Sequence, residues 1–238
     1  MVLAKLPEVT GKGITKAPTD PLFDMDSEVV RLAALFAPLL RDQVNEAGQA
    51  AILTVSADSF DPTDPQVVAF IAGRTEKVSK SINEETDKQL RSELADGLNK
   101  GESIQELQAR IERVYGAAAG YRAERIARTE TIRAETFSSI EGWRQSEQVE
   151  GKEWYTAVDE RVCSYCKPMD GKTIGLTKSF FKKGSSFTTP QLDGNGNPVI
   201  DEDGNDVMTT IKFDYESIDG PPLHANCRCT LLPILKEN

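Results

Sequence analysis

The spacing of hydrophobic residues changes near residue 150 of this 238-residue chain. In residues 26–149 they recur three and four positions apart, which is the pattern of amphipathic helices. From residue 150 onward, short apolar runs are separated by Asp-Gly and Asn-Gly pairs, which predicts strands joined by tight turns. The pattern therefore predicts an α+β fold, with a helical N-terminal region and a smaller β-rich C-terminal domain at 150–238. Residues 1–25 mix Pro, Gly, Thr and Lys without periodicity, and we expect a flexible arm or linker there.

Five stretches of the helical region carry the helical pattern, at 27–40, 44–53, 65–98, 104–114 and 121–145. Pro38 should kink or end the first stretch, and Gly73 marks a break in the third. Pro65 is a good first-turn residue with Asp64 as its N-cap. The segment Ser103–Glu106 has the spacing of a capping box and predicts the start of the fourth stretch. The apolar stripes predict core packing or, alternatively, a face for a partner helix.

Strand and turn signals divide the β-rich domain. Residues 153–158 are predicted to form a strand and residues 170–174 a tight hairpin turn. A last strand is predicted at 229–234, at a sheet edge, because Pro233 cannot donate a ladder hydrogen bond. Between them lies an acidic hairpin insert, residues 187–219, whose DGNGN and EDGND segments suit surface turns. An EF-hand is excluded, because neither register of the insert has Gly at position six and Glu at position twelve.

The formal net charge is −10, from 28 Lys and Arg residues against 38 Asp and Glu residues. The insert at 187–219 holds eight acidic residues against one lysine, so most of this charge is concentrated there. A protein that coats nucleic acid is excluded, because phosphate binding needs clustered lysines and arginines. One local basic patch is a candidate for a weak contact with DNA or with an acidic partner: Lys172, Lys178, Lys182 and Lys183.

No membrane partner and no secretion signal are predicted. The most apolar stretch, Val29–Leu40, is interrupted by Arg31 and Pro38 and is too short to span a bilayer. Residues 1–18 contain lysines but lack the apolar segment of a signal peptide. We therefore expect a cytosolic setting, in which cysteines are reduced or metal-bound rather than paired as disulfides.

All four cysteines lie in the β-rich domain, as two close pairs. Cys163 and Cys166 form a C-x-x-C pair, whereas Cys227 and Cys229 follow the one histidine of the chain, His224. Zinc prefers four thiolate and imidazole ligands in a tetrahedron, and a C-x-x-C turn can place two sulfurs on one ion. We therefore expect a structural zinc ion bound by the four cysteines, with His224 as an alternate ligand for one of the last two. A redox pair and simple burial in the core are the alternatives.

Catalytic motifs are missing from the sequence. The chain has no Walker A motif, no G-x-S-x-G motif and, with one histidine, no two-histidine zincin motif. His224 and a cysteine could form a nucleophile pair, but both belong to the predicted metal cluster. A catalytic zinc is disfavoured as well, since a cysteine-saturated site leaves no position for water.

Arg122, Arg125 and Arg128 are spaced by three residues in a predicted helix and alternate with glutamates. A solvated, salt-bridged helix face is the favoured interpretation of this pattern. Alternatively, the segment Arg128-Thr129-Glu130 makes a buried polar contact with the β-rich domain.

An ordered set of motifs resembles the phage Mu F-like family of minor head proteins. In chain order it comprises Arg125–Thr131 (RIARTET), Trp154, Asp159–Cys166 (DERVCSYC), Met169–Lys172 (MDGK) and Pro221–Cys229 (PPLHANCRC). The resemblance implies structural roles for the motif residues outside the cysteine pairs, namely Arg128, Thr129, Glu130, Asp159, Asp170 and Gly171.

The resemblance implies a minor capsid protein for head morphogenesis in a tailed phage or prophage. Such a protein associates with the portal protein, and with scaffold or capsid protein, during procapsid assembly in the host cytoplasm. It then stays in the virion, inside the head near the portal vertex, where it contacts packaged DNA or takes part in DNA delivery. The alternative is an enzyme, either a nuclease with a Cys/His knuckle or an ADP-ribosyltransferase, because the family has a suggested likeness to the latter. Since no complete catalytic constellation is seen, we expect no enzyme.

Overall fold

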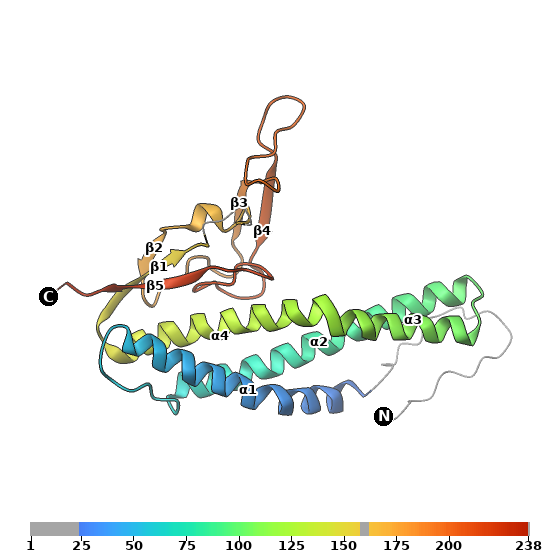
Figure 1. Ribbon diagram of the computed structural model, residues 1–238, viewed down its shortest axis with the longest axis horizontal. Helices are drawn as coiled ribbons and strands as arrows, with labels where there is room; N and C mark the ends of the chain where they lie inside the picture. Colours follow the sequence, from blue (N-terminus) through green and yellow to red (C-terminus); the bar gives the residue numbers. More distant parts are fainter. Residues whose placement is uncertain (1–23, 158–161, 238) are drawn as a thin grey trace. The chain divides into compact units, whose positions relative to one another are not determined.

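Figure 1 shows the computed structural model of the chain, which describes residues 24–157 and 162–237. The chain folds as two compact units. Of the described residues, unit 1 comprises 24–41 and 68–124, and unit 2 comprises 42–67, 125–157 and 162–237. The α+β prediction is confirmed, because helices occupy the N-terminal half and strands the C-terminal part. Nearly all of the flexible arm expected at 1–25 lies outside the described residues.

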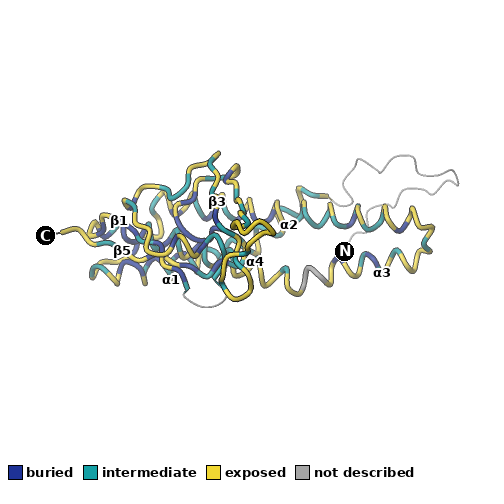
Figure 2. The backbone as a smooth tube through the Cα atoms, turned by 90° about the horizontal axis from the view of Figure 1, so that it is seen from above, coloured by how far each residue is buried: buried dark blue, intermediate teal, exposed yellow. Residues whose placement is uncertain are grey.

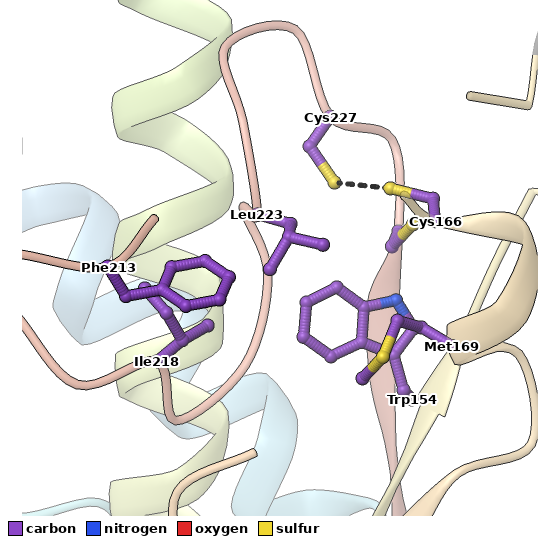
Figure 3. Close-up of a cluster of buried hydrophobic side chains, with 8 residues drawn as sticks. Trp154, Cys166, Met169, Phe213, Ile218, Leu223 and Cys227 are labelled. Carbon is purple, nitrogen blue, oxygen red and sulfur yellow. Dashed lines mark hydrogen bonds between the residues drawn. The ribbon is translucent and has the colours of Figure 1, made fainter. Parts of the chain in front are cut away.

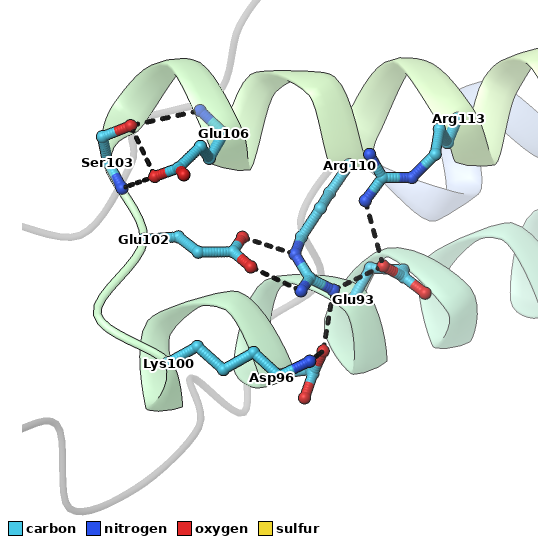
Figure 4. Close-up of polar contacts among 8 residues, drawn as sticks. All are labelled: Glu93, Asp96, Lys100, Glu102, Ser103, Glu106, Arg110 and Arg113. Carbon is cyan, nitrogen blue, oxygen red and sulfur yellow. Dashed lines mark hydrogen bonds and ion pairs between the residues drawn. The ribbon is translucent and has the colours of Figure 1, made fainter.

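The helical elements are α1 (Met25–Leu53), α2 (Pro65–Asn99), α3 (Ile104–Ala117), a π-helical turn (Ala118–Arg122) and α4 (Ala123–Ser146). Both predicted N-terminal caps are confirmed. Asp64 Oδ1 accepts the backbone N–H of Gln66 at 2.8 Å. In the capping box, Ser103 N–H donates to Glu106 Oε2 at 2.7 Å, and Glu106 N–H donates to Ser103 Oγ at 3.4 Å (Figure 4). No helix among the described residues is long and apolar enough to cross a membrane.

The predicted helix end at Pro38 and the predicted break at Gly73 are wrong, because α1 continues through Pro38 and α2 continues through Gly73. In α2, Ile71, Thr75 and Val78 are buried at spacings of four and three, so the buried stripe runs unbroken past the glycine. In α1 the buried residues (Val44, Gly48, Ala51 and Ile52) all follow Pro38, and the helix continues although proline removes one backbone hydrogen-bond donor.

An ion-pair network joins the end of α2 to α3 within unit 1 (Figure 4). The guanidinium of Arg110 donates to Glu102 Oε2 at 2.6 Å and to Glu93 Oε2 at 2.7 Å. It also lies 2.8 Å from Asp96 Oδ2. Arg110 is buried and binds carboxylates of both α2 and the turn that follows it. The network therefore fixes the connection between the two helices.

In unit 2, three antiparallel strands form a sheet in the order β2-β1-β5: β1 (Val149–Tyr155), β2 (Thr173–Gly175) and β5 (Thr230–Leu235). The edge position predicted from Pro233 is confirmed, since β5 is an outer strand. A buried cluster joins the sheet to α4, with Trp143 from the helix against Val149 and Leu231 from the strands. The buried residues of the sheet lie mainly in β1, whereas β5 is mostly half-buried or exposed (Figure 2).

The acidic hairpin, defined here as Ser186–Lys212, is formed by β3 (Ser186–Pro190), β4 (Met208–Lys212) and the loops between them. Its outer part consists of two eight-residue repeats, QLDGNGNP at 191–198 and VIDEDGND at 199–206. Backbone bonds of 2.7–2.8 Å join Gln191, Val199 and Val207 in a closed triangle. In each repeat an aspartate, Asp193 or Asp201, accepts two backbone N–H groups of its own turn. The insert is thus built from the surface turns that its Asp-Gly and Asn-Gly pairs predicted.

Within unit 2, α1 and α4 cross closely at Gly48 and Gly142. A Cβ atom on Gly142 would lie 2.8 Å from the Gly48 carbonyl oxygen, which is backbone and cannot move aside alone. We expect Gly142→Ala to lower the free energy of unfolding of unit 2 by about 1–3 kcal/mol through overpacking. Gly73→Ala in α2 is the control, because a Cβ there meets nothing within 4 Å. It should instead stabilise its helix by up to about 1 kcal/mol. Urea unfolding of both variants measures the contrast, and equal effects would contradict the crowded crossing.

Candidate metal centre

The first cysteine pair lies in a tight turn that follows β1. The backbone N–H of Cys166 donates to the Cys163 carbonyl at 3.1 Å and also approaches the Cys163 sulfur at 3.3 Å. A short 3₁₀ helix, η2 (Lys167–Met169), follows directly. An N–H group directed at a sulfur stabilises the thiolate form, which is the form that binds metals.

The second half of the centre is a matching turn at His224–Cys227. The backbone N–H of Cys227 donates to the His224 carbonyl at 3.2 Å, as Cys166 does to Cys163. Asn226 adopts a left-handed conformation, with φ of 62°. His224 Nδ1 lies 2.7 Å from the Ala225 carbonyl and donates its hydrogen there, so Nε2 keeps its lone pair. This is the orientation of a metal-binding histidine.

The two turns and Cys229 bring five donor atoms together, although sixty residues separate the two cysteine pairs in the sequence. His224 Nε2 lies 2.8 Å from Cys163 Sγ and 3.3 Å from Cys166 Sγ. Cys166 Sγ lies 3.7 Å from Cys227 Sγ (Figure 3). Cys166 belongs to two groups of mutually close donors, one with Cys163 and His224 and one with Cys227 and Cys229. Sulfurs on one tetrahedral zinc ion are about 3.8 Å apart at the usual Zn–S length, so the donor chemistry and the Cys166–Cys227 spacing fit zinc.

The centre lies in the main hydrophobic core of unit 2 (Figure 3). Cys166, Cys227 and Cys229 are buried and Cys163 is half-buried, and all four are free thiols. Their apolar neighbours are Trp154, Met169, Phe213, Ile218 and Leu223. Because the metal ligands and the core residues are the same or adjacent, a bound metal would hold the core of this unit together.

Hydrogen bonds inside the cluster separate the pKa values of its thiols. The pKa of Cys163 is lowered to about 4, first by the hydrogen bond from Cys166 and then by His224. The pKa of Cys229 is lowered by hydrogen bonds from Cys166 and Cys227, whereas that of Cys166 is raised because it donates. Burial lowers the pKa of His224, but the contact with Cys163 outweighs it and the net shift is upward. The sulfur and nitrogen atoms of the cluster are therefore joined by a few shared protons. A divalent cation would displace those protons when it binds.

Asp170 and Gly171 form hydrogen bonds that stabilise the backbone next to the metal centre. Asp170 Oδ1 accepts the backbone N–H of Thr156 at 2.8 Å. The Thr156 hydroxyl in turn lies 3.2 Å from the Cys166 carbonyl and 3.6 Å from Cys229 Sγ. Gly171, with φ of 71°, donates its N–H to the Trp154 carbonyl at 2.9 Å. These contacts give both motif residues a structural role, whereas Asp159 lies outside the described residues.

The arginine-rich segment of α4 contacts the centre through Thr129. Its hydroxyl accepts the backbone N–H of Asn226, the left-handed residue of the second turn, at 3.2 Å. Thr129 thus makes a polar contact with the β-rich domain, which is the interpretation that the charge pattern disfavoured. Arg128 is exposed and Glu130 half-buried, and both have polar partners. In unit 1, Arg122 donates to the Ile82 carbonyl at 3.1 Å, so it too does more than face solvent.

Thr129→Val should destabilise unit 2, because it leaves the Asn226 N–H without its acceptor while keeping the side-chain shape. We expect a loss of about 1–3 kcal/mol. Thr131→Val is the matched control on an exposed position two residues away and should change stability by less than about 0.5 kcal/mol. Chemical unfolding with tryptophan fluorescence checks both, and equal losses would contradict the contact.

Sequence reasoning did not find Ser164, Tyr165 and Lys167, which bind the acidic hairpin from positions around Cys166. The residues between two metal ligands look arbitrary in a sequence, so no pattern signals their partners. The four lysines of the predicted basic patch (Lys172, Lys178, Lys182 and Lys183) are all exposed.

The sequence profile described as "Phage Mu protein F like protein" matches residues 88–232, more than half of the chain. The chain belongs to the phage Mu protein F-like family. The matched region of this Mu F-like protein contains Thr129, both turns of the metal centre and the acidic hairpin. The resemblance expected from the motifs is thus confirmed.

A curated relative of the Mu F-like protein carries an enzyme name. The chain is 27% identical over 181 residues to "NAD(+)--arginine ADP-ribosyltransferase EFV" of Enterococcus faecalis (strain ATCC 700802 / V583). The match covers 74% of this chain but spans 35% of the length of that relative. No solved structure matches the chain.

Proposed function

We propose that this Mu F-like protein is a minor capsid protein that acts in head morphogenesis of a tailed phage or prophage. The observation that carries this proposal is the family match over residues 88–232, which includes α4, most of the sheet and the candidate metal centre together. In this role it associates with the portal protein during procapsid assembly, with scaffold or capsid protein as further partners. It remains in the virion, inside the head near the portal vertex.

The test uses the full chain with the portal, scaffold and capsid proteins of the same phage or prophage. We expect it to copurify with the portal protein and to be present in procapsids and virions at low copy number. A phage lacking the gene should make fewer infectious particles. Absence of the protein from purified procapsids and virions would overturn the proposal.

Within this role, we propose that one zinc ion binds Cys163, Cys166, His224 and Cys227. The two turns that supply these ligands have the same backbone hydrogen bond, and His224 presents Nε2 to both sulfurs of the first turn. Cys229 is also close to Cys166 and Cys227, but in addition it has the Thr156 hydroxyl as a polar neighbour. This ligand set differs from the four-cysteine set expected from the sequence, because His224 takes the place of Cys229.

Metal analysis of protein purified without added zinc tests the ligand set. We expect about one zinc ion per chain in the wild type and in Cys229→Ser, and almost none in His224→Ala. His224→Cys should restore binding, because a thiolate can replace the imidazole. The opposite result for Cys229→Ser and His224→Ala would show the four-cysteine set, and a zinc-free wild type would refute the site.

An ADP-ribosyltransferase is the second candidate, favoured by the name of the E. faecalis relative. Because the match spans 35% of that protein, the name alone does not show which part carries the activity. Two shallow grooves of about 500 and 600 Å³ stand out among the described residues, and neither is lined by the cysteines or by His224. We expect no transfer from labelled NAD⁺ to a free guanidinium acceptor; robust transfer by purified protein would favour the enzyme.

A weak contact with packaged DNA through the basic patch is a further part of the proposal. We expect a salt-dependent shift of duplex DNA that is lost when Lys178, Lys182 and Lys183 are changed to glutamine. A shift that persists in this triple variant would exclude the patch.

A further inference from the structure

Ser164, inside the first metal-binding turn, binds the acidic hairpin at two points. Its hydroxyl accepts the backbone N–H of Leu192 at 2.8 Å. Its carbonyl accepts the hydroxyl hydrogen of Thr189, a buried residue of β3, with an oxygen–oxygen distance of 3.2 Å. The turn between two predicted ligands therefore contacts both a strand of the hairpin and the start of its first loop.

Tyr165 and Lys167 extend these contacts. The Tyr165 hydroxyl lies 2.6 Å from Thr209 Oγ1 on β4, and Lys167 Nζ donates to the Gly196 carbonyl at 2.9 Å. The residues on both sides of Cys166 thus contact β3, β4 and the first repeat of the hairpin. Tyr165 also lies near the metal ligand His224, with ring centroids 6.5 Å apart.

The inner end of the hairpin is held differently. Phe187 on β3 and Ile211 on β4 pack against the hydrophobic core, and Phe187 contacts Phe181 at a ring-centroid distance of 5.0 Å. Phe213, directly after β4, stacks on Phe181 at 4.6 Å. This aromatic base depends on apolar packing, whereas the contacts farther along depend on the position of the Cys163–Cys166 turn.

We propose that the Cys163–Cys166 turn couples metal binding to the position of the acidic hairpin, with Ser164, Tyr165 and Lys167 as the positioning residues. When zinc binds Cys163 and Cys166, the turn is fixed and holds the hairpin in one orientation. When zinc leaves, the turn loses its shape and no longer holds the hairpin in that orientation. This inference rests on the zinc site proposed above.

The coupling gives the metal a role beyond stability. The hairpin carries five acidic residues (Asp193, Asp201, Glu202, Asp203 and Asp206) and one lysine, all in a single projecting element (Figure 1). The carboxylates of Asp193 and Asp201 are used within their own turns, whereas the others are exposed. The metal therefore sets the direction in which this negative charge is presented to assembly partners.

Pulsed EPR on the full chain tests the coupling. Spin labels are attached through ketone-bearing unnatural amino acids at positions 202, in the hairpin, and 178, after β2, so that no cysteine is added. We expect one narrow distance distribution in the zinc-loaded protein and a broad one after chelation. Ser164→Ala/Tyr165→Phe should also give a broad distribution while keeping the wild-type zinc content. Thr188→Val is the control, because it removes a hydroxyl contact within the hairpin, to Thr210, and should leave the distribution narrow.

The outcomes separate the two proposals. A zinc-free wild type would overturn the zinc site and the coupling together. A zinc-loaded double variant with a narrow distribution would overturn the coupling alone. If the double variant loses zinc, Lys167→Met is measured instead, because the Lys167 side chain contacts the hairpin from outside the Cys163–Cys166 pair. A narrow distance distribution in Lys167→Met would overturn the coupling.

Discussion

Cys166→Ser should abolish zinc binding and unfold the β-rich part of unit 2. Cys166 is 3% exposed and is the donor shared by both groups of the metal centre. Structural zinc contributes roughly 10–16 kcal/mol of binding free energy in small zinc domains. Whole domains are stable by only about 5–15 kcal/mol, so losing the ion removes most or all of the stability of such a unit. Replacing one sulfur by oxygen changes little else in the packing.

Tryptophan fluorescence measures this effect directly, because both tryptophans, Trp143 and Trp154, are buried in unit 2. Cys166→Ser should show exposed tryptophan emission in buffer, and chelation of the wild type should produce the same spectrum. The helical signal of unit 1 should persist in circular dichroism. Cys229→Ser is the matched control, since it removes a buried thiol from the same core without removing a proposed ligand. Wild-type stability of Cys166→Ser would show that no metal supports this fold.

The features of the fold that follow local patterns were predictable. The caps at Asp64 and Ser103, the edge position of Pro233 and the turns of the acidic hairpin each depend on a few neighbouring residues, and the structure has all of them. The helix break at Gly73 was wrong because the buried stripe of α2 outweighs the weak helix propensity of one glycine, and α1 continues through Pro38 without a buried residue beside it. The grouping of 42–53 and 125–146 with the strands depends on contacts between distant segments, which no window of sequence reports.

The candidate metal centre was also predictable only where a local sequence pattern reports it. Cysteine spacing predicted which residues come together, because thiolate pairs have few other uses in such a pattern. It left the choice among five donors open, and the tautomer of His224 is what favours the histidine. The role of Thr129 was disfavoured because neighbouring charges suggested a solvated face, whereas its partner is a backbone N–H ninety-seven positions away. Backbone partners leave no trace in side-chain patterns.

Trp154→Ala should cause the largest loss of stability among substitutions that leave the ligands intact. Trp154 is completely buried and packs edge-on against Phe180, with ring centroids 5.2 Å apart. It also belongs to the core cluster that includes three of the cysteines. Deleting the indole leaves a large cavity beside the metal centre, and we expect a loss of about 3–5 kcal/mol. The unfolding of unit 2 is followed through the fluorescence of the remaining tryptophan, Trp143, which is also buried.

Two further variants identify the cause. Tyr155→Ala is the matched control on the same strand, since Tyr155 is 47% exposed and points to the opposite face, and it should cost less than about 1 kcal/mol. Trp154→Phe keeps an aromatic ring but removes the buried indole N–H, which lies near Cys229 and helps to lower the pKa of that thiol. Because an N–H contact to sulfur is weak, most of the stability should be retained, in contrast to Trp154→Ala. If Trp154→Phe were as damaging as Trp154→Ala, the tryptophan would support the metal centre through this N–H rather than through packing.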